Sequence, residues 1–147
     1  MPDSYPVLFE KALAQAIDDA NLGLYKSTGS YTAVETTVAT PGIMTTGPDL
    51  PTTFDNCIVL TQLEPITDGR ANIVWRIQLF VRLKGTKTQI KDLVWNLRVL
   101  LDHKQNIPSG FDVSWVWVFS QLFFTADSSQ RQSAALTVYF RGRRPLA

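Results

Sequence analysis

Alternating hydrophobic and polar positions run through the middle of the chain, over residues 73–85. All odd-numbered positions from 73 to 83 are apolar, and the even-numbered positions include Arg76, Gln78, Arg82 and Lys84. Because side chains of a strand alternate between its two faces, this pattern predicts a long strand with one buried face and one mostly cationic face.

Two stretches show the three- and four-residue spacing of apolar positions that is typical of amphipathic helices. The first covers residues 4–24, with Pro6 in its first turn and Gly23 near its end. The second covers residues 86–104 and begins with a capping box, in which Thr86 and Gln89 satisfy free backbone amides. A strand that runs directly into a helix is typical of a two-layer α+β domain.

Three further strands are predicted, at residues 57–63, 111–126 and 133–141. A turn at residues 64–72, with Pro65 and an Asp-Gly pair, joins the first of them to the central strand as a hairpin. Simple alternation in 111–126 predicts two faces: one carries Trp115, Trp117, Phe119 and Phe123, and the other carries Val116, Val118, Leu122 and Phe124. Helices can cover only one of these faces, so we expect a subunit contact on the other.

These elements predict a single α+β domain over residues 1–147. We expect an antiparallel sheet of about four strands with two helices packed on one face, a long loop at 25–56 after the first helix, and a short basic tail at 141–147. The loop is rich in Thr, Gly and Pro, which favour turns and extended chain. Loops of this length are usually binding elements or disordered, and we interpret this one as a segment that becomes ordered against a partner.

Composition and charge limit the function classes. The chain is 45% hydrophobic and 18% charged, as expected of a globular protein, and its net charge of +1 gives no general attraction to nucleic acid or acidic membranes. No apolar run reaches the roughly 18 residues of a membrane span, and the N-terminus lacks the basic stretch of a signal peptide. We therefore expect synthesis in the cytoplasm and no membrane association.

Candidate chemistry is sparse. The single cysteine, Cys57, excludes an intramolecular disulfide and cannot build a zinc site by itself. The single histidine, His103, is explained by the end of the second helix, where positive charge is favourable. We predict no catalytic residues, no metal and no cofactor. Cations around Phe80 on the central strand could contact phosphate and bases, but a solvated or interfacial sheet face is the interpretation we favour.

Several segments resemble a known family. The sequence RIQLFVRLKGTKTQIKDLVWNLRVLL resembles the strand, glycine and helix segment of the minor capsid or tail-completion proteins of long-tailed bacteriophages, the tail terminators. LGLYKSTGSYTAVET is similar to the end of that family's first helix and its Gly-Tyr loop, and DSSQRQSAALTVYFRGRRP is similar to its closing hairpin. The resemblance follows the family's order over most of the chain.

The resemblance implies a structural virion protein, not an enzyme, that is assembled in the host cytoplasm and located in the tail or neck. Its subunits would form a hexameric ring at the head-proximal end of the tail tube, ending tube polymerisation and providing the head–tail joining surface. Its partners would be the tail tube protein and a head-completion or stopper protein. DNA would pass through the lumen without sequence-specific binding.

Site residues follow from this interpretation. The lumen or a subunit interface is assigned to Arg76, Gln78, Arg82 and Lys84. Partner docking is assigned to Tyr31, Val34, Val38, Ile43, Met44, Arg141, Arg143 and Arg144. Two alternatives remain: a head-completion or stopper protein of the neck, and, from a different class, a small ligand-binding or enzymatic α+β domain in which His103 and Cys57 would be tested first.

Overall fold

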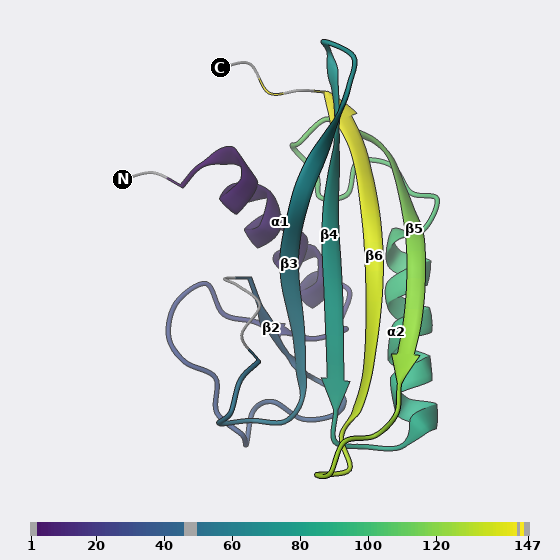
Figure 1. Ribbon diagram of the computed structural model, residues 1–147. Coiled ribbons are helices and arrows are strands. Elements are labelled where there is room, and N and C mark those ends of the chain that lie inside the picture. The colour runs from purple at the N-terminus through teal and green to yellow at the C-terminus, as the bar shows by residue number, and fades with distance from the viewer. Residues whose placement is uncertain (1–2, 46–49, 144, 146–147) are drawn as a thin grey trace.

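A sheet backed by two helices forms the protein. The computed structural model describes residues 3–45, 50–143 and 145. Over these residues the sheet has six strands in the order β1-β2-β3-β4-β6-β5, with both helices on one face (Figure 1). The elements are α1 (Tyr5–Asp19), β1 (Leu24–Tyr25), β2 (Gly42–Met44), β3 (Cys57–Asp68), β4 (Asn72–Leu83), α2 (Lys87–Leu101), β5 (Val113–Phe124) and β6 (Gln132–Arg143).

The predicted antiparallel four-stranded sheet is wrong. Strands β3, β4, β6 and β5 pair with one another in antiparallel fashion, but β1 pairs with β2 in parallel, and β2 pairs with β3 in parallel. The sheet is therefore mixed, and both additional strands lie in or next to the predicted long loop. Two or three residues are too few to show an alternating pattern, so pairing decides their conformation: β2 pairs with β3, and β1 pairs with β2.

Both helices begin where their sequences predict, but both end earlier: α1 at Asp19 instead of residue 24, and α2 at Leu101 instead of residue 104. Helix α1 ends at Asp19, and Asn21 then turns the chain with a φ of 62°. Helix α2 has the predicted capping box: the Thr86 hydroxyl accepts from the backbone amide of Gln89 at 3.2 Å, and the side-chain Oε1 of Gln89 accepts from the backbone amide of Thr86 at 2.8 Å. His103 lies just beyond α2, outside its last turn.

The core lies between the helices and the odd-numbered positions of β4. Ile77, Leu79 and Val81 are fully buried there, as the alternation predicts. Trp75, on the same face, stacks against Phe9 of α1, with ring centroids 5.6 Å apart. Helices α1 and α2 therefore cover this face of the sheet together.

The hairpin of β3 and β4 is longer than predicted. Pairing extends from Cys57 opposite Arg82 to Asp68 opposite Asn72, with a bulge between Leu63 and Ile66. Most of the predicted turn at 64–72 is therefore strand. The hairpin projects past the helices at the top of Figure 1.

A register shift in β5 corrects the predicted faces of that strand. One extra residue lies between Val118 and Ser120, and such a bulge reverses the side-chain alternation beyond it. Leu122 and Phe124 therefore lie on the same side as Trp117, and not on the opposite side as simple alternation predicts. The local sequence carries no signal for this insertion.

Candidate assembly surface

The sheet face away from the helices, called the open face below, carries a cluster of large apolar side chains. Strand pairing places members from β4, β5 and β6 on this face. The cluster, called the aromatic patch, consists of Phe80, Trp117, Phe119, Leu122, Phe124 and Tyr139. Sequence reasoning expected an apolar second face on β5 but assigned Leu122 and Phe124 to the wrong side.

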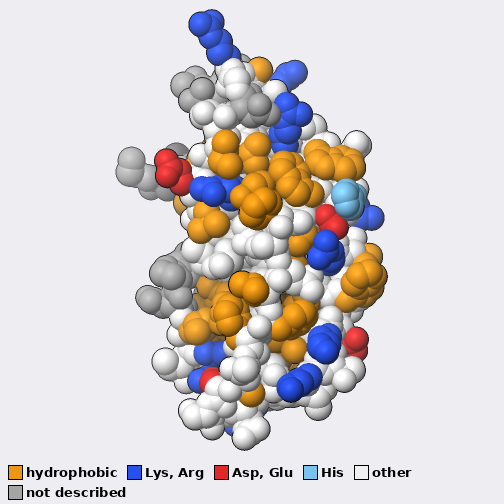
Figure 2. Space-filling view, turned by 45° about the vertical axis from the view of Figure 1, so that its right-hand side comes forward, with side chains coloured by type: hydrophobic (Ala, Val, Ile, Leu, Met, Phe, Trp, Pro, Cys, Tyr) orange, Lys and Arg blue, Asp and Glu red, His pale blue; other side chains and the backbone are white. Residues whose placement is uncertain are grey.

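Ring contacts between strands join the members of the aromatic patch within two groups. Phe119 stacks on Tyr139 with ring centroids 4.5 Å apart and planes 8° apart, and Trp117 meets the same tyrosine edge to face at 5.4 Å. Phe80 and Phe124 are 6.1 Å apart. Hydrophobic side chains gather in two groups on this side of the molecule, separated by a largely polar band (Figure 2).

Several members of the aromatic patch are exposed to an extent that is unusual for their size. Phe119 is 61% exposed, Leu122 60% and Phe124 47%. Large apolar side chains exposed in such groups usually mark an interaction site. The open face can therefore bind another apolar surface.

Arg76 and Gln78 lie on the open face of β4, next to the aromatic patch. Arg76 pairs with Tyr139 across the strands, and its Nε donates to the carbonyl of Glu64 at 2.7 Å. Lys84 follows the end of β4 and is exposed, with its backbone amide bonded to the Asn56 side chain at 2.9 Å. Their assignment to a lumen or subunit interface stays a prediction.

Arg82 has a different environment from the other three. It is only 4% exposed, and its guanidinium donates to the carbonyls of Pro51 at 2.8 Å and of Phe54 and Asp55 at 2.9 Å. A buried charge requires such partners, and here the chain supplies them itself. The interpretation of Arg82 as a surface cation is wrong, because residues 51–55 fold over it.

The predicted loop is tied to the rest of the chain through its described residues. Ile43 is fully buried in the core as part of β2, so its assignment to partner docking is wrong. The Tyr31 hydroxyl donates to the Ile43 carbonyl and accepts from the Lys26 amide. Val38 and Met44 also pack against buried clusters.

Val34 and the end of β6 remain accessible among the docking candidates. Val34 is 89% exposed, and Arg141 and Arg143 are exposed on β6. Arg144 lies outside the described residues. The accessible docking candidates are therefore one apolar side chain in the loop and two arginines at the C-terminal end of β6.

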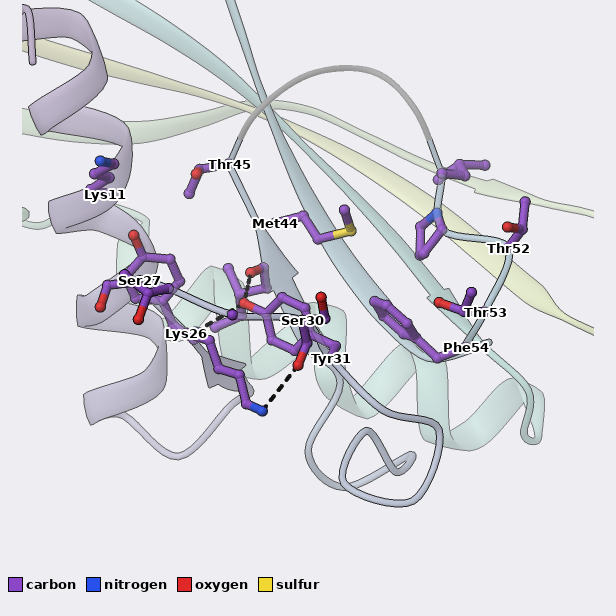
Figure 3. A pocket seen from close by; sticks show the side chains of 16 residues that line it. Lys11, Lys26, Ser27, Ser30, Tyr31, Met44, Thr45, Thr52, Thr53 and Phe54 are labelled. Carbon is purple, nitrogen blue, oxygen red and sulfur yellow. Dashed lines mark hydrogen bonds between the residues drawn. The ribbon is translucent and has the colours of Figure 1, made fainter.

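A hollow of about 610 Å³ lies between α1 and the loop (Figure 3). Its two lysines are paired with acids: Lys11 contacts Asp3 and Lys26 contacts Glu35, each at 2.6 Å. These pairs compensate the positive charge at the hollow. Over the described ranges, no group of three or more His, Cys, Asp or Glu side chains is placed to hold a metal ion.

Cys57 and His103 do not form a catalytic pair. Burial raises the pKa of the Cys57 thiol to about 11, although the nearby Arg82 partly opposes this shift. His103 is exposed and makes an edge-to-face contact with Trp115 of β5, with ring centroids 5.6 Å apart. Cys57 lies on β3, so β4 and β6 separate the two residues.

Comparison with known proteins shows a similarity in fold but no match in sequence. No protein family and no curated protein matches the chain in sequence. Among solved structures, the fold is similar to that of a chain in the structure titled "Virion of native gene transfer agent (GTA) particle", with a TM-score of 0.64 and 12% identity. The match covers 96% of this chain and 100% of that chain, so the two share one architecture over their length. No described helix has the length and apolar character needed to cross a membrane.

Proposed function

We propose that this protein is a structural component of a virion, and within that class a tail terminator. The observation that carries this proposal is the full-length fold similarity to a chain from a virion particle. The exposed aromatic patch adds to it, because a subunit of a large assembly needs apolar surface for its neighbours. In this role the subunits form a hexameric ring on the head-proximal end of the tail tube.

The ring ends tube polymerisation and offers its other side to the head-completion protein. Arg76, Gln78 and Lys84 line the lumen or a boundary between subunits, and DNA passes without being read. The net charge of +1 suits this role, since a strongly basic lumen would hold the DNA that has to move through it.

We also propose that the protein acts by binding and not by catalysis. The buried Cys57 thiol and the distant His103 supply no activated nucleophile. A Cys57→Ser, His103→Ala double variant should therefore assemble as the wild type does. Loss of function in a correctly folded double variant would instead favour a ligand-binding or enzymatic domain.

Mass measurement tests the proposed function directly. The purified protein is analysed by light scattering coupled to size exclusion, alone and with the tail tube protein. We expect a closed ring of six subunits in at least one condition, whereas a strict monomer in both would contradict the proposal. Co-purification then distinguishes a tail terminator from a stopper protein of the neck, because a terminator binds the tail tube protein and a stopper binds the portal adaptor.

The role of the loop in docking is best tested by a point substitution. Deleting residues 36–51 would remove β2 and the Pro51 carbonyl that accepts a hydrogen bond from Arg82. Loss of function could then result from misfolding and would not test docking. Val34→Asp changes an exposed side chain only, and we expect it to weaken co-purification with the partner. Thr28→Asp, at another exposed position of the loop, serves as the matched control.

A further inference from the structure

A second apolar surface lies on the outer side of α2. Trp95 is 63% exposed and Val99 is 53% exposed. They are four residues apart, so their side chains share one face of the helix. The side of α2 that packs on the sheet is formed by other residues, Ile90, Val94, Leu97 and Leu101. The fold of the single chain therefore leaves Trp95 and Val99, called the helix stripe below, without apolar cover.

We propose that the helix stripe of one copy docks on the aromatic patch of a second copy. This inference rests on the proposed function, since it names the surfaces through which identical subunits assemble. The contact joins two unlike surfaces and is therefore head to tail. Repeated along successive subunits, such a contact produces a ring when its rotation closes.

The position of the two surfaces favours contact between copies. Helix α2 packs on the core side of the sheet (Figure 1). Strand pairing places the aromatic patch on the open face, so the two surfaces cannot meet within one chain. A two-fold contact of patch against patch would leave Trp95 in water. Contact between unlike surfaces covers both.

The size of the aromatic patch also fits a subunit contact. Because aromatic side chains present about 150–250 Å² each, the exposed fractions leave roughly 400 Å² of apolar surface on the patch. A standard interface buries about 800 Å² per partner, of which somewhat more than half is apolar. The two groups of the patch together thus provide about the apolar area of one side of a stable interface, with the polar band between them.

Charges near the two surfaces are compatible with this arrangement. Asp92 lies three residues before Trp95 on the exposed side of α2, and has no ion pair with another described residue. Arg76 borders the aromatic patch on β4. The Asp92 carboxylate beside the helix stripe and the Arg76 guanidinium beside the aromatic patch carry opposite charges, which is compatible with contact between the two surfaces. Tryptophan is also among the residues that contribute most to binding at interfaces.

Two complementary variants test the contact. The first carries Trp95→Ser and Val99→Ser, and the second carries Phe119→Ser and Leu122→Ser. All four side chains are at least half exposed, so both variants should keep the wild-type circular dichroism spectrum. Loss of the stack of Phe119 on Tyr139 should lower the Tm of the second variant by only a few degrees. Each variant alone should assemble at least about tenfold more weakly than the wild type. A 1:1 mixture should form a heterodimer of twice the 16.5 kDa subunit mass, since one intact patch and one intact stripe remain.

The outcomes separate this inference from the proposed function. Leu8→Ser removes an exposed apolar side chain of α1, 45% exposed, and should assemble as the wild type does. If either double variant assembles normally, the contact is overturned while assembly of the virion protein stands. A mixture of folded variants that stays monomeric overturns the pairing of these two surfaces and favours a foreign partner or a two-fold contact. A wild type that is monomeric with and without tail tube protein overturns both.

A cross-link provides a measurement that does not depend on weakened binding. Asn96→Cys in one chain and Ser120→Cys in another place thiols beside the helix stripe and the aromatic patch. We expect an intermolecular disulfide between these two chains and none when Thr28→Cys replaces Ser120→Cys. Equal cross-linking of both pairs would contradict the specific contact.

Discussion

Phe124 of β5 lies against Phe80 of β4, with ring centroids 6.1 Å apart, although β6 separates their strands. Ala135 of β6 pairs with Phe80 on one side and with Leu122 on the other. Its small side chain leaves room for the two rings to meet above it. The contact also depends on the bulge after Val118, which brings Phe124 to the open face.

A double-mutant cycle between Phe80 and Phe124 tests this arrangement. We expect a coupling free energy of about 0.5–1 kcal/mol for Phe80→Ala with Phe124→Ala, the usual range for a pair of contacting rings. Urea unfolding of the two single variants and the double variant supplies the value. Phe80 and Phe123 form the control pair, because Phe123 points to the other face and should show no coupling. Equal coupling for both pairs would mean that the bulge is not where the structure places it.

Arg82 should be important for stability although it is charged. Arg82→Met leaves the carbonyls of Pro51, Phe54 and Asp55 without their donor, and we expect a loss of about 2–4 kcal/mol in the free energy of unfolding. Hydrogen exchange should locate the loosened region at residues 51–56. Arg70→Met, in the exposed hairpin turn, is the matched control and should change stability by less than about 0.5 kcal/mol. Equal effects at both positions would refute the structural role of Arg82.

Glu10 on α1 should make stability depend on pH. Burial raises the pKa of its carboxyl from 4.5 to about 7, and a hydrogen bond from the backbone of Gln62 only partly opposes this shift. The folded chain therefore favours the neutral carboxyl. Its contribution to stability is fully present below pH 4.5 and is lost as the pH rises through about 7.

The size of the Glu10 effect is modest, because the side chain is only half-buried. Allowing for solvent screening, stability should fall by about 1–2 kcal/mol between pH 5 and pH 8. Glu10→Gln should remove this fall, and Glu64→Gln, at an exposed position, should keep it. Unfolding curves at several pH values measure both, and a wild-type profile that matches the Glu10→Gln profile would rule out the shift.

Cys57 should be unreactive in the folded protein. Raising the pKa of its thiol from 9.0 to about 11 lowers the thiolate population at pH 8 about a hundredfold, and burial restricts access further. An aromatic disulfide reagent should therefore label the native chain at least about a hundredfold more slowly than the chain unfolded in guanidinium. Since Cys57 is the only cysteine, the released chromophore reports on it alone. Fast labelling under native conditions would show that residues 51–56 open readily.

The candidate surface could be predicted only in part. Alternation in the central strand placed Arg76 and Gln78 correctly on the face away from the helices, and Val34 is accessible as a docking residue requires. Alternation did not show that residues 51–55 cover Arg82 or that Ile43 enters the sheet. Those two outcomes depend on segments that are distant in sequence.

The sequence by itself determined the local elements: the buried odd-numbered face of β4, the two amphipathic helices and the capping box at Thr86. Each of these has a signal within a few residues, because side-chain periodicity and capping are local properties of the backbone. Tertiary structure alone decided the parallel strands β1 and β2, the cover over Arg82 and the face of Phe124. These features follow from the pairing and bulging of strands far apart in the chain, which local alternation cannot reveal.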